Sequence, residues 1–341
     1  MRKTKIYYLI NCALFCFSGF LGLIVCEVAL RLENGTFFME QPLHEETIND
    51  IEYAFWFPTH HIESQLLTKQ SAIITVGDSF VAGQGCVTQE TNLLGHLKRA
   101  VNNQHVGFLN LGVGNTNPAH YLDIMLAFDI GIGDTVIILF YDNDLVVDDK
   151  TCRIILRQSK KYDLYVPNFC PGLVEGNIEG KIGLSSGQKV NHFLNDFHVW
   201  WIIKTALYNI PILHSFFNRT ENLAAWSDDS GEQIQWLLST IPVIKSYLES
   251  QGAKAVFGYY PNTNNIHQGD YRHDIWLNFI KEVRNKYQLE ILDPYPFLID
   301  NATGRSMTRS LTDKHPSCEA HGIVADFIFQ KLRLIDEGST D

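Results

Sequence analysis

Basic side chains are scarce in this chain, and the closely spaced cysteine pairs that bind metals are missing. Lysine and arginine total 27 against 38 aspartate and glutamate residues, which gives a formal net charge of −11. Nucleic-acid binding needs a basic face that neutralises phosphates, so this charge argues against a nucleic-acid partner. None of the seven cysteines stands in a Cys-x-x-Cys pair, so no zinc site is expected. We expect no other metal or cofactor.

Charge is also absent from Ile6 to Cys26, directly after the basic segment Met1–Lys5. At 1.5 Å per residue, a helix over this run is roughly 30 Å long, which matches the hydrocarbon core of a bilayer. A cleaved signal peptide is the alternative, but the run is longer than the usual apolar core and no Ala-x-Ala site follows it. We therefore expect residues 1–31 to be an uncleaved single-pass anchor in the cell (inner) membrane. The rest of the chain would face outward, into a periplasm.

The remaining chain divides into three parts. Residues 32–70 show no sustained period and are expected to form a stalk. From residue 71, apolar runs alternate with helical patterns, which indicates a single α/β domain, 71–335, with a five-stranded, mainly parallel sheet. The predicted strands are 72–76, 106–111, 135–141, 253–260 and 289–293, and the predicted helices are 92–103, 118–129, 231–251, 274–288 and 319–334. The alternation stops at about 145–228, which we expect to be an insertion in this domain.

The most informative motif is Gly77-Asp78-Ser79-Phe80, which follows the first predicted strand. A serine after a buried strand presents its hydroxyl at the carboxyl edge of the sheet, where open α/β sheets hold their reactive sites. A serine hydroxyl acts as a nucleophile only when a base and an oxyanion site accompany it. The rest of the chain must therefore supply both.

Residues that follow other strands can supply these groups. His315 lies just before the last predicted helix, and Asp313 stands two residues before it, close enough to orient the imidazole. Gly112 and Gly114 follow the second strand, and either N–H can serve as an oxyanion donor. Asn143 follows the third strand and offers a carboxamide donor. A local turn explains each residue taken alone, so it is the combination that points to catalysis.

Four cysteines lie beyond the predicted anchor. Cys152 and Cys170 close a short loop, and we expect them to form a disulfide, since an outward location permits one. Cys86 and Cys318 each lie within a few residues of a candidate catalytic group. They form either a second disulfide or two buried free thiols.

The order of these blocks along the chain resembles that of the SGNH hydrolase superfamily, the GDSL-type esterases and lipases. The blocks are Gly77 to Phe80, Asn110 to Gly114, Asn143-Asp144 and Asp313 to His315, and the resemblance runs from about residue 71 to 334, without the insertion. It implies a three-layer α/β/α sandwich of the flavodoxin-like SGNH fold. A single anchor before such a domain is similar to bacterial envelope members of the family.

The resemblance also implies roles for the residues. Ser79 would be the nucleophile and His315 the general base, with Asp313 as its orienter. The N–H groups of Ser79 and Gly114 and the side chain of Asn143 would form the oxyanion hole, with Gly112 as the alternative to Gly114.

The sequence departs from the family pattern at several positions. Phe80 stands where the family has leucine, and Tyr141 stands where it has glycine, which is expected to narrow the site. The glycine turn is one residue short, and the last block is Asp-x-His in place of Asp-x-x-His.

We therefore expect a membrane-anchored serine ester hydrolase that acts through an acyl-enzyme. Its expected substrate is an O-acyl (O-acetyl) ester on envelope carbohydrate, an expectation that rests on the resemblance and the expected location. The alternatives are a polysaccharide O-acyltransferase, a lipid esterase or lysophospholipase, and a non-catalytic binding protein that retains the fold.

Overall fold

The computed structural model describes most of the predicted α/β domain. The described residues are 44–48, 51–55, 71–83, 86, 89–114, 116–145, 149–162, 165–168, 170, 230–263, 266, 271–302, 307–308 and 315–338, together with Ser18, Gly22 and Val25. They fall mainly in one compact unit, Gln41–Glu179 with Leu223–Asp341. The predicted anchor, 1–31, lies outside the described residues apart from those three. Within the described part of the chain, no helix has the length and apolar character needed to cross a bilayer.

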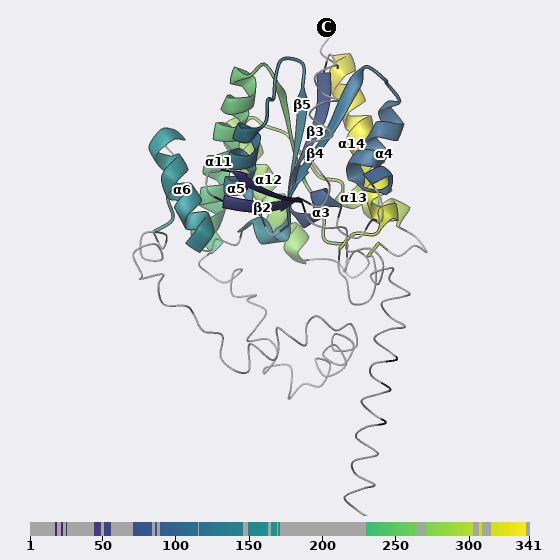
Figure 1. Cartoon of the computed structure of the whole chain (residues 1–341), viewed down its shortest axis with the longest axis horizontal. Helices are drawn as coiled ribbons and strands as arrows, with labels where there is room; N and C mark the ends of the chain where they lie inside the picture. The colour runs from purple at the N-terminus through teal and green to yellow at the C-terminus, as the bar shows by residue number, and fades with distance from the viewer. Residues whose placement is uncertain are drawn as a thin grey trace, which may run out of the picture. The chain divides into compact units, whose positions relative to one another are not determined.

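A five-stranded parallel sheet forms the centre of this unit, as the sequence predicts (Figure 1). Its spatial order is β4-β3-β5-β6-β7, and every neighbouring pair is parallel. The strands are β3 (Ser71–Gly77), β4 (Val106–Gly112), β5 (Thr135–Phe140), β6 (Lys254–Tyr259) and β7 (Ile291–Leu292). After β3 the chain forms β4 on one side of β3 and then crosses back to form β5 on the other side of β3. The carboxyl end of β3 is therefore the topological switch point, where α/β proteins place ligands.

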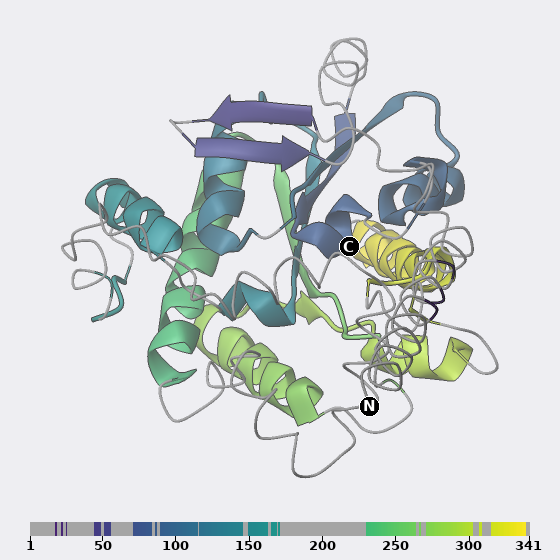
Figure 2. The ribbon, with the colours of Figure 1, turned by 60° about the horizontal axis from the view of Figure 1, so that its bottom comes forward.

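Helices cover both faces of the sheet and make three layers (Figures 1 and 2). Alternate residues of β5 show the division, because Ile138 packs into one core and Ile137 into the other. The first face carries α5 (Pro118–Ala127), α11 (Ser230–Ser250) and α12 (Tyr271–Tyr287), and the second carries α4 (Leu93–Val101), α13 (Tyr295–Asn301) and α14 (Cys318–Gly338). The predicted α/β/α arrangement is therefore observed.

Several elements were not predicted. An antiparallel hairpin of β1 (His44–Ile48) and β2 (Ile51–Phe55) lies within the predicted stalk, and β1 packs against α5. The Asn49-Asp50 pair between the two strands is a turn signal in the sequence. The predicted insertion begins with α6 (Asp149–Tyr162), which also packs on α5. The rest of the insertion lies outside the described residues, apart from 165–168 and 170.

Two disulfides join described residues. The first, Cys86–Cys318, spans 232 positions and is called the site disulfide below. The second, Cys152–Cys170, spans 18 positions at α6 and is called the insertion disulfide. On a chain-entropy account, loops of these lengths stabilise the fold by about 5 and about 3 kcal/mol.

Candidate active site

The structure brings Ser79 and His315 together at the carboxyl edge of the sheet. Ser79 Oγ lies 3.1 Å from His315 Nε2, although the two residues are 236 positions apart. β3 ends at Gly77, Asp78 follows it, and Ser79 is the first residue of the next helix. His315 lies just before α14. Nε2 can accept the serine proton when the imidazole carries its own proton on Nδ1. Asp313 lies outside the described residues, so its predicted role as orienter stays a prediction.

The turn that presents Ser79 is built by its immediate neighbours. Asp78 caps α3 (Ser79–Ala82), and its carboxylate accepts a hydrogen bond from the Phe80 N–H at 2.9 Å. Its other oxygen lies 3.5 Å from Ser79 Oγ. A side chain at Gly77 would stand 2.9 Å from the Leu139 carbonyl oxygen of β5, so only glycine fits there. Ser79 is 8% exposed, which leaves its hydroxyl shielded at the rim of the sheet.

Hydrogen bonding separates the two glycines that the sequence left as alternatives. The Gly112 N–H donates to Asn110 Oδ1 at 2.9 Å, so it is already engaged. A Cβ at Gly112 would lie 2.2 Å from the Ala82 nitrogen, which means that this glycine lets α3 approach β4. Gly114, in the turn just beyond β4, is therefore the better oxyanion donor of the two, although its role stays a prediction.

Asn110 is a supporting residue whose role the sequence pattern did not reveal. Besides accepting from Gly112, its side-chain Nδ2 donates to the Val81 carbonyl oxygen at 3.0 Å. It thus ties the short helix that begins at Ser79 to β4. An asparagine in an otherwise apolar strand was the available signal.

The turn that carries Asn143, η2 (Asp142–Leu145), is held from one side by Asp142. The Asp142 carboxylate is buried and accepts hydrogen bonds from side chains of β6, the loop after β6 and α12. The donors are Trp276 Nε1 at 2.9 Å, Tyr259 OH at 3.2 Å and Asn262 Nδ2 at 3.2 Å.

Asp144 holds the same turn from the other side. Its carboxyl accepts from the Tyr121 hydroxyl at 2.6 Å and from the Tyr141 N–H at 2.9 Å. Burial, and then the nearby Asp78 carboxylate, raise the pKa of the Asp144 carboxyl well above its ordinary value. The Asn143 side chain itself lies outside the described part of the structure, so its predicted role as donor stays a prediction.

Aromatic rings line the Ser79–His315 pair. The Phe80 ring stacks on Tyr141 with centroids 3.6 Å apart, and its centroid lies 5.5 Å from that of the His315 ring. Phe80 and Tyr141 are two of the departures from the family pattern, and here they pack against each other. They occupy space beside the pair.

A buried tyrosine and histidine stand behind these rings. The rings of Tyr260 and Phe80 make an edge-to-face contact with centroids 5.6 Å apart. The Tyr260 hydroxyl lies 2.9 Å from His321 Nδ1. Burial lowers the pKa of His321 to about 3, with smaller contributions from His96 and His315. His321 is therefore neutral at physiological pH.

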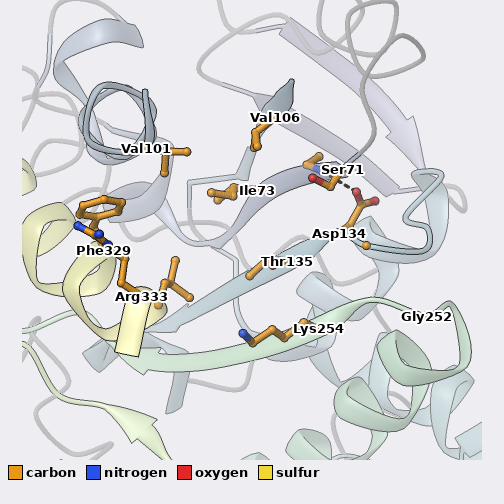
Figure 3. Close-up of a pocket in the computed structure, with 13 residues that line it drawn as sticks. Ser71, Ile73, Val101, Val106, Asp134, Thr135, Gly252, Lys254, Phe329 and Arg333 are labelled. Atoms are coloured by element: carbon orange, nitrogen blue, oxygen red, sulfur yellow. Dashed lines mark hydrogen bonds between the residues drawn. The ribbon is translucent and has the colours of Figure 1, made fainter. Parts of the chain in front are cut away.

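A cavity of about 480 Å³ lies at the opposite edge of the sheet, where the strands begin (Figure 3). Asp134 lies on its wall, and its carboxylate accepts from the Ala72 N–H at 2.7 Å. Lys254 and Arg333 also line it. Because Ser79 and His315 are at the other end of the strands, this cavity is separate from the candidate active site.

Comparison with known proteins finds similar structures but no similar sequences. No protein-family model matches the chain, and no curated protein matches it. A lipolytic protein of the G-D-S-L family from Veillonella parvula is 10% identical, with a TM-score of 0.42 over 76% of this chain and 97% of the other. An acetyl xylan esterase is 11% identical, with a TM-score of 0.39 over 76% and 98%. An extracellular lipase from Streptomyces rimosus is 8% identical, with a TM-score of 0.40 over 76% and 98%. At such values the function has to be argued from the chain's own residues.

Proposed function

We propose that this protein is a serine ester hydrolase that acts through an acyl-enzyme on Ser79. One observation carries the proposal: Ser79 Oγ lies 3.1 Å from His315 Nε2 at the switch point of the sheet. A hydroxyl within hydrogen-bond reach of an imidazole is the arrangement that nucleophilic catalysis requires.

The reaction would proceed in two halves. In the first, His315 Nε2 takes the proton from Ser79 Oγ as the oxygen attacks the carbonyl carbon of the ester. The imidazolium then gives this proton to the leaving alcohol, the carbon–oxygen bond of the ester breaks, and the acyl group remains on Ser79. In the second half, His315 Nε2 takes a proton from water as the water oxygen attacks the acyl carbon. The imidazolium then returns this proton to Ser79 Oγ as the bond between Oγ and the acyl group breaks, which releases the acid and restores the free serine.

The negative charge on the carbonyl oxygen needs donors in both halves. Ser79 is the first residue of α3, so its N–H has no acceptor within the helix and can point to a ligand. We assign the other donors to the Gly114 N–H and to the Asn143 side chain. Because Asp142 and Asp144 fix the η2 turn through several hydrogen bonds, the backbone of Asn143 is held in place before substrate arrives.

The proposed substrate is a short O-acyl ester, O-acetyl above all, on a carbohydrate of the cell envelope. The short acyl group rests on the family resemblance and on the bulk of the Phe80 ring, which stacks on Tyr141 and has its centroid 5.5 Å from that of the His315 ring. The carbohydrate part rests on the family resemblance of the motifs. The proposed location is outward of a membrane, on the anchor predicted for residues 1–31.

The test compares the purified full chain with its Ser79→Ala variant on p-nitrophenyl acetate, p-nitrophenyl octanoate and acetylated xylan. We expect acid release by the native protein, faster with acetate than with octanoate, and a loss of about 10³-fold or more in the variant. A fluorophosphonate probe should label the native protein at Ser79.

Equal rates for the two proteins, or no labelling at Ser79, would rule out the hydrolase. Faster release of octanoate would redirect the proposal to a lipid esterase. Transfer of the acetyl group from p-nitrophenyl acetate to added xylan, with no free acetate, would identify an acyltransferase that uses the same serine.

A further inference from the structure

The site disulfide joins the two chain segments that carry the proposed nucleophile and base. Cys86 follows Ser79 by seven positions, and Cys318 follows His315 by three positions. The insertion disulfide, Cys152–Cys170, joins α6 to the segment just after it and includes neither catalytic segment. The two disulfides therefore form a natural pair for comparison.

On the nucleophile side, Cys86 is tied to the helix that begins at Ser79. Gly83 closes α3, and its N–H donates to the Ser79 carbonyl oxygen. The Cys86 N–H then donates to the Gly83 carbonyl oxygen at 3.0 Å. Displacement of Cys86 would therefore be passed to the turn that presents the serine hydroxyl.

On the base side, Cys318 is the first residue of α14, and Ser317 fixes this start. The Ser317 hydroxyl accepts from the Ala320 N–H at 3.2 Å. The main-chain N–H of Ser317 donates to the Met307 carbonyl oxygen at 2.9 Å. His315 stands two positions before Ser317. The site disulfide thus closes a covalent path between the hydroxyl and the imidazole that must stay about 3 Å apart for proton transfer.

The two disulfides also differ in exposure. Cys318 is partly exposed, and Cys86 is 4% exposed. Cys152 and Cys170 are both 0% exposed. Thiol–disulfide exchange needs access of a thiolate to one sulfur, so a small dithiol should reach the site disulfide first.

We propose that the site disulfide positions His315 against Ser79 and that its reduction by a dithiol reversibly slows the reaction. This inference rests on the proposed function. In the exchange, a dithiol thiolate attacks Cys318 Sγ and the Cys86 thiolate leaves. The second thiol of the reagent then displaces Cys318, so the protein gains two electrons and two protons and the reagent becomes a cyclic disulfide.

The test treats the full-length protein with increasing dithiothreitol, below its unfolding temperature. Alkylation and mass spectrometry identify which disulfide has opened, and circular dichroism follows the fold. When only the site disulfide is open, we expect kcat on p-nitrophenyl acetate to fall about 10- to 100-fold, because a shift of about 1 Å in a catalytic group has effects of this size. KM should change less than about twofold, since no substrate contact is removed.

Fluorophosphonate labelling separates mispositioning from unfolding. A mispositioned base slows labelling while the final stoichiometry stays at that of the untreated protein, and reoxidation restores the rate. A stoichiometry that falls in proportion to kcat would mean that part of the protein had unfolded, and it would overturn the proposal.

Matched variants repeat the comparison without reductant. Cys86→Ser with Cys318→Ser should show the slow labelling and low kcat, and Cys152→Ser with Cys170→Ser should keep both parameters within about twofold of the native protein. Native rates in the first variant, or opening of the insertion disulfide first, would refute the inference. If the untreated native protein neither hydrolyses the ester nor takes up the probe, the proposed function itself has failed.

Discussion

Polar side chains have different tasks at the two ends of the central sheet. At the amino end, Asp134 accepts hydrogen bonds from the main-chain N–H groups of Ala72, at 2.7 Å, and Gly131, at 2.9 Å. At the carboxyl end, Ser79 and His315 meet each other through side-chain atoms. The Asp134 carboxylate binds main-chain groups at the end of the sheet away from the proposed nucleophile and so serves the fold, whereas a hydroxyl held against an imidazole can exchange a proton. The comparison predicts that substitutions at the carboxyl end lower activity and those at the amino end lower stability alone.

The largest effect is expected from removal of the imidazole. His315→Ala should lower kcat on p-nitrophenyl acetate by about 10²- to 10⁴-fold, because it removes the general base. Asp134→Ala, the matched change at the amino end, should lower the free energy of unfolding by about 1–3 kcal/mol, since it leaves two N–H groups without their carboxylate partner. Its kcat should stay native. Steady-state kinetics measure kcat and urea unfolding measures the free energy of unfolding for both variants. A large fall in kcat for Asp134→Ala would contradict the comparison.

The next effect concerns pH and the buried His321 behind the site. Its pKa is about 3 in the folded protein and 6.5 as the ordinary value, so the unfolded chain binds more protons between these limits. The folded state therefore loses stability as the pH falls from 6.5 towards 3, by on the order of 3 kcal/mol by about pH 4. His321→Gln should show a shallower decline in urea unfolding experiments over that range. Parallel pH profiles for the two proteins would contradict this.

A third prediction uses two glycines. Gly112→Ala places a methyl group 2.2 Å from the Ala82 nitrogen, so α3 must move away from β4. We expect a loss of about 1–3 kcal/mol in unfolding free energy and a fall of about 10²-fold in kcat. Gly131→Ala at the amino end is the control, because nothing lies within 4 Å of its added carbon. Native kcat in Gly112→Ala would show that the approach of α3 does not position Ser79.

The smallest effect is expected at Asp144. Asp144→Ala leaves the Tyr121 hydroxyl and the Tyr141 N–H without this partner, and the η2 turn should loosen. We expect kcat to fall about 10-fold, which is less than the loss of a whole oxyanion donor. Asp144→Asn should stay within about threefold of native kcat, because the amide keeps a polar group between Tyr121 and Tyr141, and because burial and the Asp78 carboxylate raise the pKa of Asp144 and so disfavour its charge. Equal losses in the two variants would indicate that the charge of Asp144 matters.

Prediction from the sequence succeeded where a segment's own pattern decides its structure. The apolar run 135–141 predicted β5 almost to the residue, because a strand buried on both faces reads as a continuous apolar segment. The hairpin of β1 and β2 was missed because His44-Glu45-Glu46-Thr47-Ile48 has no such pattern. The segment becomes the strand β1 because it pairs with β2 and packs on α5.

The candidate site was predicted in part for the same reason. Gly77, Asp78 and Ser79 form a local turn whose residue types reveal it in the sequence. The choice between Gly112 and Gly114 was left open, because it depends on the distance between β4 and α3. A glycine's sequence position does not report whether another backbone lies against it.

The sequence by itself determined the alternation of strands and helices and the turn that carries the serine at the end of β3, because neighbouring residues control both. Only the tertiary structure decided that Ser79 meets His315 and that Cys86 pairs with Cys318. The residues of the first contact are 236 positions apart in the sequence, and those of the second are 232 positions apart. Their geometry depends on how the sheet order and the helix layers pack, and no short stretch of sequence contains that information.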